Sequence, residues 1–565
     1  MRCTTIALLV SQALLIPATM AADDSVQLER KIEALNQQVA ELTEWLEEND
    51  SRLDASERHS ALDRVTITGD FRTRGHNLSY NNVSVNPGAY VDFDDFGQRA
   101  MAGEFGDPSS TSSAIGQMMA AYPQMAAAFM AGQLNGVGAM PVGTPQTYDI
   151  NNDMFYTTRL RLNLKAKVWD NVSFSGRLAM FKNWGDDTGV QVFDSWRSFN
   201  MDGTSSGNPS GDDLFVERAF FDWNHIGGTD AYLSIGRRPS SYGAPSHFRE
   251  NEKRGGTPSG HVVNFNFDGL TAGYKLDKIT GWEGQVARLC LGQGFESQYG
   301  NGELYNNIVT EDTYLGGFNI DVLADGSNFL QVILFGAKDI TDGFKGTIAV
   351  PDAMLPPEQQ MPGMNPVMRV QPSNVIGDMF LGGVTFTKEQ DNGLKWFASL
   401  GWTRTMPNGN AGMFGGMHSD AVYQIDNIGA NGVPTMVIDR ASSTEDRDGY
   451  SAYLGLQQPL GDGALGLEYN YGSKYWTPFT QAQDDPVGSK LATRGHAVEA
   501  YYLHNINPKM FFKMAALYYD YDYSGSGSPV GAPVAIDDIE AGSALANMPV
   551  IDTALDLNLG ITIKF

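Results

Sequence analysis

The sequence predicts an all-β protein, a transmembrane antiparallel β-barrel of 16 to 18 strands that follows a short α-helical coiled coil. The clearest observation is the final stretch, residues 553–565, which reads TALDLNLGITIKF. Its side chains alternate between apolar and small or polar, and alternate side chains of a strand point to opposite faces. A tilted strand of about ten residues with one apolar face is long enough to span a bilayer.

The same alternation recurs along residues 65–565, which we expect to form the barrel. Short turns such as WDN, LADGS and GDG alternate along the chain with long connections. Membrane barrels have short periplasmic turns and long extracellular loops. We therefore expect the extracellular loops to be residues 75–154, 239–260, 339–377 and 405–447. The alternation of loop lengths is interrupted between Gly269 and Tyr314, which leaves the strand count between 16 and 18.

The N-terminus, residues 1–21, has the features of a secretory signal peptide. Arg2 precedes an apolar run from Thr4 to Ile16, and small residues follow at the expected cleavage site. Cleavage leaves Cys290 as the only cysteine, so no intrachain disulfide is expected. No later stretch has 18 consecutive apolar residues. An exported chain with spanning strands is expected in the outer membrane of a Gram-negative cell, in contact with its lipids.

Residues 22–60 carry a heptad pattern that predicts a coiled coil in the periplasm. Apolar side chains recur at alternating steps of four and three residues, with Asn49 at one core position. The predicted core consists of Leu28, Ile32, Leu35, Val39, Leu42, Leu46 and Leu53. β-Branched residues at a with leucine at d favour a dimer in isolation, whereas attachment to a large barrel favours a trimer. The alternative is a single amphipathic helix that packs on its own barrel.

The charge and the motifs argue against several classes of function. A formal net charge of -27 argues against nucleic acid as a partner. The histidines are scattered, and neither G-x-S-x-G nor H-E-x-x-H occurs, so we do not expect an enzyme. Methionine-rich loops offer soft metal ligands but have no fixed spacing, so we expect neither a metal site nor a cofactor.

Cationic side chains collect on the predicted inner faces of the strands and in one loop. A barrel of this size encloses an aqueous channel, where fixed positive charge selects for anions. The predicted pore-lining and constriction residues are Arg72, Arg74, Arg159, Arg161, Lys165, Arg177, Arg218, Arg237, Arg238, Arg249, Lys253 and Arg254. There are two alternatives. The strand cations pair with Asp70, Glu217, Asp222, Glu468 or Asp520 and only hydrate the lumen, or the loop is an ordinary solvated outer loop.

Two stretches carry a resemblance to a known family. They are NNDMFYTTRLRLNLKAKVWDNVSFSGRLAMFKNWGDD, residues 151–187, and GRRPSSYGAPSHFRENEKRGGTPSGHVVNFNFDGL, residues 236–270. The chain resembles an uncharacterised family, a domain of unknown function, of exported outer-membrane proteins from anaerobic or metal-respiring proteobacteria. The resemblance covers most of the chain after the signal peptide. It implies a porin-like barrel with an N-terminal coiled coil, and it brings no substrate and no functional residues.

These features predict an outer-membrane porin for the passive diffusion of small hydrophilic, anionic solutes. The expected partners are these solutes, copies of the same chain, and the barrel assembly machinery, which would read Phe565 as its signal. The alternative is a structural or partner-binding barrel without an open channel, either assembled through the coiled coil or serving as a sheath for a redox partner. The Ala- and Met-rich first loop leaves open whether the pore is plugged.

Overall fold

A computed structural model divides the chain into two units, Met1–Thr66 and Ile67–Phe565. The structure describes residues 32–39, 42–43, 65–85, 146–185, 214–296, 310–342, 346–349, 367–370, 374–412, 415–419, 422–428, 434–439, 442–481, 484–544 and 550–565. In the first unit, residues 32–39 and 42–43 are helical. The predicted coiled-coil residues in these ranges, Ile32, Leu35, Val39 and Leu42, are each more than half exposed. Leu28, Leu46, Leu53, the signal peptide and residues 86–145 of the first loop lie outside the described residues.

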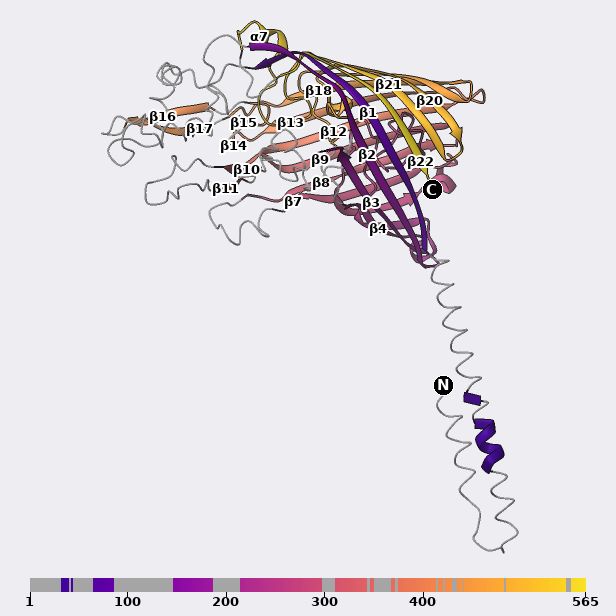
Figure 1. The fold of residues 1–565 in the computed structure, drawn as a ribbon. Coiled ribbons are helices and arrows are strands. Elements are labelled where there is room, and N and C mark those ends of the chain that lie inside the picture. The colour runs from indigo at the N-terminus through magenta and orange to yellow at the C-terminus, as the bar shows by residue number, and fades with distance from the viewer. Residues whose placement is uncertain are drawn as a thin grey trace, which may run out of the picture. The chain divides into compact units, whose positions relative to one another are not determined.

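Sixteen antiparallel strands close into one barrel, which confirms the predicted fold class (Figure 1). In barrel order they are β1 (Val65–Val85), β2 (Gln146–Trp169), β3 (Val172–Asn183), β4 (Phe215–Trp223), β5 (Ala231–Arg237), β6 (Asp268–Lys275), β7 (Val286–Phe295), β8 (Thr313–Ala324), β9 (Asn328–Thr341), β12 (Val375–Glu389), β13 (Lys395–Pro407), β18 (Arg447–Leu460), β19 (Gly463–Gly472), β20 (Gly495–Asn507), β21 (Met510–Tyr521) and β22 (Thr553–Lys564). Where the loop alternation is interrupted in the sequence, residues 276–285, which include a helical turn, join β6 to β7.

The remaining described elements are small and lie in the connections. The two-stranded pairs are β10 (Gly346–Ala349) with β11 (Val367–Val370), β14 (Ala411–Gly412) with β15 (Gly415–Gly416), and β16 (Val422–Ile428) with β17 (Pro434–Asp439). The helical turns are η2 (Ile226–Gly228), α6 (Asp277–Thr280), η6 (Lys490–Ala492) and α7 (Ile536–Glu540). None of the described helices has the length and apolar character needed to cross a membrane.

The connections differ in length at the two ends of the barrel. At the end where the chain terminates, the strands are joined by turns such as 170–171, 461–462 and 508–509. At the other end, residues 238–267 join β5 to β6, and residues 473–494 join β19 to β20. We call these the short-turn end and the long-loop end. The first long connection is shorter than the sequence suggests, because β1 and β2 extend to Val85 and Gln146.

The barrel closes where its first strand pairs with its last. β1 and β22 pair from Asp70 opposite Lys564 to Asn81 opposite Thr553. Gly69 and Phe565 exchange backbone hydrogen bonds at 2.9 Å in both directions. The regular terminal stretch is therefore a closing strand, whose backbone groups leave no open edge between β1 and β22.

The polarity of the barrel wall is inverted relative to a soluble protein. On β13, Ser399 is fully buried and its neighbour Leu400 is 61% exposed. On β22, Asp556 is buried, while Leu557 and Leu559 are about half exposed. Because successive side chains of a strand point to opposite faces, the inner face is polar and the outer face is apolar.

Two long connections fold into the barrel and fill part of its interior. We call residues 238–267 the first inner loop and residues 473–494 the second inner loop. Most of their described residues are buried, including Trp476 at 0% exposure. Arg249 of the first loop contacts Glu499 of β20, and Asp484 of the second contacts Arg72 of β1, so these loops reach inward-facing residues of widely separated strands.

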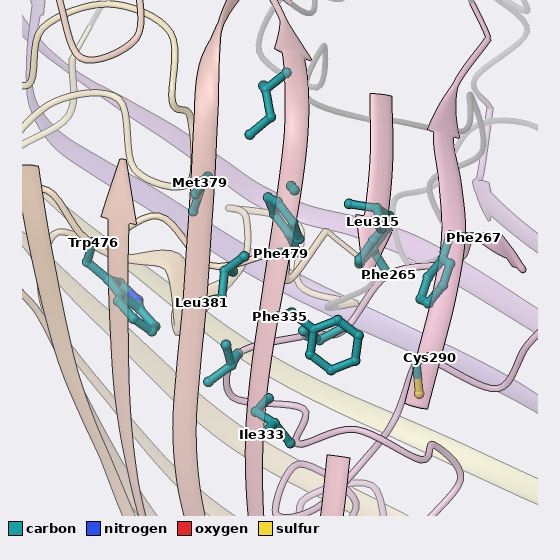
Figure 2. Packing of buried hydrophobic residues seen from close by; sticks show 14 of the residues in the cluster. Phe265, Phe267, Cys290, Leu315, Ile333, Phe335, Met379, Leu381, Trp476 and Phe479 are labelled. Carbon is teal, nitrogen blue, oxygen red and sulfur yellow. The ribbon is translucent and has the colours of Figure 1, made fainter. Parts of the chain in front are cut away.

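An apolar cluster holds both inner loops against one side of the wall. Phe265 and Phe267 from the first loop, and Trp476 and Phe479 from the second, pack with inward residues of β7–β9, β12 and their neighbours. Figure 2 shows Leu381, Phe335 and Cys290 of the wall beside these aromatic rings. The cluster thus fixes the bases of the two loops by burial of apolar surface.

Candidate functional site

Four arginines form a compact basic group on the inner wall. Arg72 and Arg74 lie on β1, and Arg159 and Arg161 lie on the neighbouring strand β2. A spacing of two residues on each strand places all four side chains on the same face. Each residue is no more than 4% exposed. We call this group the arginine quartet.

Carboxylates from three parts of the chain converge on the quartet. Asp70 of β1 accepts hydrogen bonds from Arg161 at 2.8 Å and from Arg159 at 3.2 Å. Glu250 of the first inner loop lies 3.1 Å from Arg72. Its other contacts are Arg74 at 3.2 Å and Arg159 at 3.4 Å.

Two further loop carboxylates complete the set. Glu252, also in the first inner loop, pairs with Arg161 and with Arg159, the latter at 3.2 Å. Asp484 of the second inner loop pairs with Arg72 and with Arg159, again 3.2 Å from the latter. Among the described residues, the wall contributes one of these four carboxylates and the loops contribute three.

Two of the loop carboxylates, Glu250 and Asp484, are held ionised by the quartet. Burial by itself raises the pKa of Glu250, but the guanidinium groups of Arg74 and Arg72 outweigh burial and bring this pKa well below its usual value. The pKa of Asp484 is lowered in the same way, because Arg72 and Arg159 outweigh the effect of its burial. Both side chains are therefore acceptors only and suit the fork geometry of arginine.

An acidic group lies on other strands of the barrel. Glu468 of β19 and Glu499 of β20 are at most 2% exposed. Lys513 of β21 pairs with Glu499 at 2.8 Å. The inner loops add Lys490, which pairs with both glutamates. They also add Arg249, which donates to Glu499 at 3.1 Å and to Asp485 at 2.8 Å.

The wall therefore carries separated charge that the inner loops neutralise. The quartet and Asp70 leave three positive charges on β1 and β2, and the loops bring three carboxylates to them. The acidic group, with Lys513, leaves one negative charge. The loops bring two cations and Asp485 to that group. Within the described part of the chain, the two groups are balanced.

The other predicted cations occupy different surroundings. Arg177 lies 3.2 Å from Glu217, and Arg218 lies 3.6 Å from the same carboxylate. Arg218 also donates to the backbone oxygens of Gly255 and Ser241 at 2.9 Å. Two arginines thus share one carboxylate here, which leaves a surplus of positive charge.

The base of the first inner loop carries the remaining pairs. Arg237 lies 3.4 Å from Asp268, and Arg238 lies 3.9 Å from Asp222. Arg254 lies 3.5 Å from Asp321 and over the ring of Phe329. Asp321 also pairs with Arg288 at 2.8 Å, so again two arginines share one carboxylate. Lys165 and Lys253 are exposed.

Sequence reasoning named some of the acids that lie in ion pairs on the inner wall and missed those on the inner loops. Of the expected carboxylate partners, Asp70, Glu217, Asp222 and Glu468 lie in the ion pairs described above. Four further acids come from the inner loops, namely Glu250, Glu252, Asp484 and Asp485. The available signal was a pair of adjacent acids, Asp484 and Asp485, in a connection between two strands. No described residues group three or more histidine, cysteine or acidic side chains in a way that suits a metal ion.

The family described as a protein of unknown function, DUF3373, matches residues 149–565, which is more than half of the chain. The chain belongs to the DUF3373 family. Two parts of the resemblance seen in the sequence are therefore confirmed, namely a family of unknown function and a barrel fold. Export, the coiled coil and the bacterial group remain predictions. None of the curated proteins compared with this DUF3373 chain matches it.

Among solved structures, this DUF3373 chain is similar to several porins at low identity. The Salmonella typhi OmpF complex with daunomycin is 10% identical, with 89% of this chain and 98% of that chain covered and a TM-score of 0.40. OmpT of Vibrio cholerae is 12% identical, with 89% and 97% covered and a TM-score of 0.35. OprB of Pseudomonas putida is 11% identical, with 90% and 97% covered and a TM-score of 0.38.

Proposed function

We propose that this protein is an outer-membrane porin that lets small hydrophilic, preferentially anionic solutes diffuse through its barrel. The observation that carries the proposal is the inverted polarity of the wall. Residues such as Leu400 and Leu559 are exposed on the outside, whereas Ser399 and Asp556 are buried inside. The apolar outer face of such a closed barrel suits contact with lipid, and its charged interior suits an aqueous lumen.

The preference for anions rests on the uneven distribution of charge in the lumen. The four guanidinium groups of the quartet are balanced by Asp70 and three loop carboxylates, so the surplus lies elsewhere. Glu217 and Asp321 each face two arginines, so both groups keep an excess of positive charge. Fixed positive charge in a narrow pore lowers the energy of an anion relative to that of a cation.

In this proposal the short turns face the periplasm and the long loops face the exterior, as in other outer-membrane barrels. The predicted coiled coil then lies in the periplasm and joins copies of the chain, and Phe565 serves as the assembly signal at the periplasmic end.

A second candidate function is a closed barrel with a structural or partner-binding role. The observation that favours it is the pair of inner loops, which are bonded to β1 and β2 on one side and to β19–β21 on another. Loops held in this way obstruct the lumen unless some of these contacts open.

Single-channel recording in a planar bilayer distinguishes the two functions. The purified protein, shown to be folded by its heat-modifiable mobility, is expected to give stepwise conductance and an anion-selective reversal potential in a potassium chloride gradient. Arg254→Gln, which neutralises a partly exposed lumen cation, should shift the reversal potential toward cation selectivity. Arg404→Gln, at an exposed ion pair on another strand, is the matched control. Absence of current from folded protein favours the closed barrel.

A further inference from the structure

The arginine quartet is occupied by carboxylates that belong to loops rather than to its own wall. Asp70 is its only described wall partner, and Glu250, Glu252 and Asp484 all arrive on the inner loops. Three loop carboxylates thus match the three positive charges that the wall leaves uncompensated.

The loop carboxylates do not satisfy all donors of the quartet. In the described part of the chain, Arg74 Nε, Arg159 Nε and Arg161 Nη1 are buried and donate no hydrogen bond. Buried donors without an acceptor are costly, and those of a charged group especially so. The quartet can therefore take more oxygen acceptors than the loops provide.

The carboxylates of the first inner loop lie on a segment of the loop that is separate in sequence from its base. Residues 247–254 lie between Gly243 and the pair Gly255–Gly256. The contacts of Glu250 and Glu252 with the quartet are ionic. Apolar packing holds the chain at Phe248, which lies against Phe397 and Tyr453, and at the base of the loop around Phe265. A carboxylate of a solute can replace a loop carboxylate on an arginine at little net cost in free energy. No solute replaces the apolar surface that a loop buries in a cluster.

We propose that the arginine quartet is a binding site for solutes that carry several carboxylate groups, and that Glu250, Glu252 and Asp484 are its internal occupants. This inference rests on the proposed porin function and names the solute class. The carboxylates are spread over the quartet: Glu252 contacts Arg159 and Arg161, and Asp484 contacts Arg72 and Arg159. An extended di- or tricarboxylate can contact several arginines of the quartet at once in the same way, whereas one compact anion cannot.

Calorimetric titration of citrate into the folded, detergent-purified protein at constant ionic strength tests the site. The variant E250Q/E252Q/D484N removes the internal occupants and should bind citrate at least roughly tenfold more tightly than the wild type. D485N is the matched control, because Asp485 is the adjacent carboxylate and pairs with Arg249 instead of the quartet. It should leave the affinity for citrate unchanged. Acetate and inorganic phosphate are the comparison probes and should bind much more weakly than citrate.

A milder variant covers the case in which the triple variant does not fold. Glu252 is the most exposed of the three occupants, at 15%, so E252Q should fold and still tighten citrate binding. The inference is overturned if the folded variants bind citrate no more tightly than the wild type. It is also overturned if D485N has the same effect, or if phosphate binds as well as citrate.

Bilayer recording of the same proteins separates this inference from the proposed function. Current that citrate reduces in the concentration range of its measured binding supports both. Tighter citrate binding by the variants without current from any folded protein keeps the site and removes the porin. Current with unchanged citrate binding keeps the porin and removes the site.

Discussion

Arg249 and Glu250 are consecutive residues whose side chains bond to different walls of the barrel. Arg249 donates to Glu499 of β20 at 3.1 Å, and Glu250 lies 3.1 Å from Arg72 of β1. One dipeptide of the first inner loop therefore joins the acidic and the basic side of the lumen. The order of the two charges matters, because each side chain meets a group of the opposite sign.

Reversing the adjacent charges tests this arrangement directly. In R249E/E250R each loop charge faces a wall group of the same sign, so the loop should detach near residues 247–254. We expect faster proteolytic cleavage of the first inner loop while the heat-modifiable barrel persists. Unchanged protease resistance would show that the ionic contacts do not hold the loop. K167D/D170K, which reverses an exposed pair and preserves its complementarity, is the control.

Removing only Arg249 should destabilise the folded state. Arg249→Gln leaves Glu499, which is fully buried, with two cations instead of three. Loss of one partner from a buried ion pair costs about 3–5 kcal/mol, and the remaining lysines place the expected cost at the lower end. Equilibrium urea unfolding in lipid vesicles measures this change. A decrease in unfolding free energy below about 1 kcal/mol would show that the Arg249 ion pair contributes no more than an exposed surface pair.

Trp476 is the main apolar anchor of the second inner loop. It is fully buried, and its Nε1 donates to the backbone oxygen of Leu491 at 2.7 Å. Trp476→Ala removes this packing, with an expected cost of about 3–5 kcal/mol in unfolding free energy. Hydrogen exchange should accelerate in residues 473–494 more than in the strands. Trp402→Ala, an outward residue of β13, should leave exchange in this loop unchanged.

The contact between Gly69 and Phe565 should control closure of the barrel. A Cβ built on Gly69 would lie 2.6 Å from the Phe565 ring and 2.7 Å from the Arg161 backbone oxygen. We expect Gly69→Ala to slow the appearance of the heat-modifiable form during folding into vesicles. Gly75→Ala is the control on the same strand, because its nearest neighbours are the Met154 and Tyr156 side chains at 3.2 Å rather than backbone atoms. Equal folding rates for the two variants would contradict this prediction.

Acidification should loosen the first inner loop through His261. Burial lowers the pKa of this imidazole from its usual value to about 3, and its two nitrogens contact Ser399 and Ser451 at 2.8 Å. Between about pH 6.5 and 3 the unfolded chain binds the proton and the folded one does not, so stability falls as the pH falls. The expected loss at pH 5 is about 2 kcal/mol relative to pH 7.

The corresponding variant isolates this effect. His261→Gln keeps hydrogen-bonding capacity toward Ser399 but has no proton to gain, so the slope of stability against pH should decrease over this window. Urea unfolding at several pH values measures the slope. A slope identical to that of the wild type would assign the acid sensitivity to the carboxylates of the inner loops instead.

The sequence alone predicted a membrane barrel and the two faces of its wall. A period of two is a local property, so it identified the closing strand and placed Arg72 and Arg159 among inward residues before any contact was known. The composition of the first inner loop, which is rich in arginine, glycine and proline, also distinguished it from the other connections.

Only the tertiary structure decided the strand number and the partners of the cations. The count of sixteen follows from closure of β1 on β22, which is a pairing between the two ends of the barrel sequence. Two acids that bind Arg72 of the quartet are distant in sequence: Glu250 is 178 residues away and Asp484 is 412 residues away. No local sequence pattern predicts contacts over such separations. The alternation of a strand shows which charged side chains face the interior. Whether these charges are balanced depends on which distant loop folds back against them. Burial of Phe265 and Trp476 in a shared apolar cluster decides which loops do so.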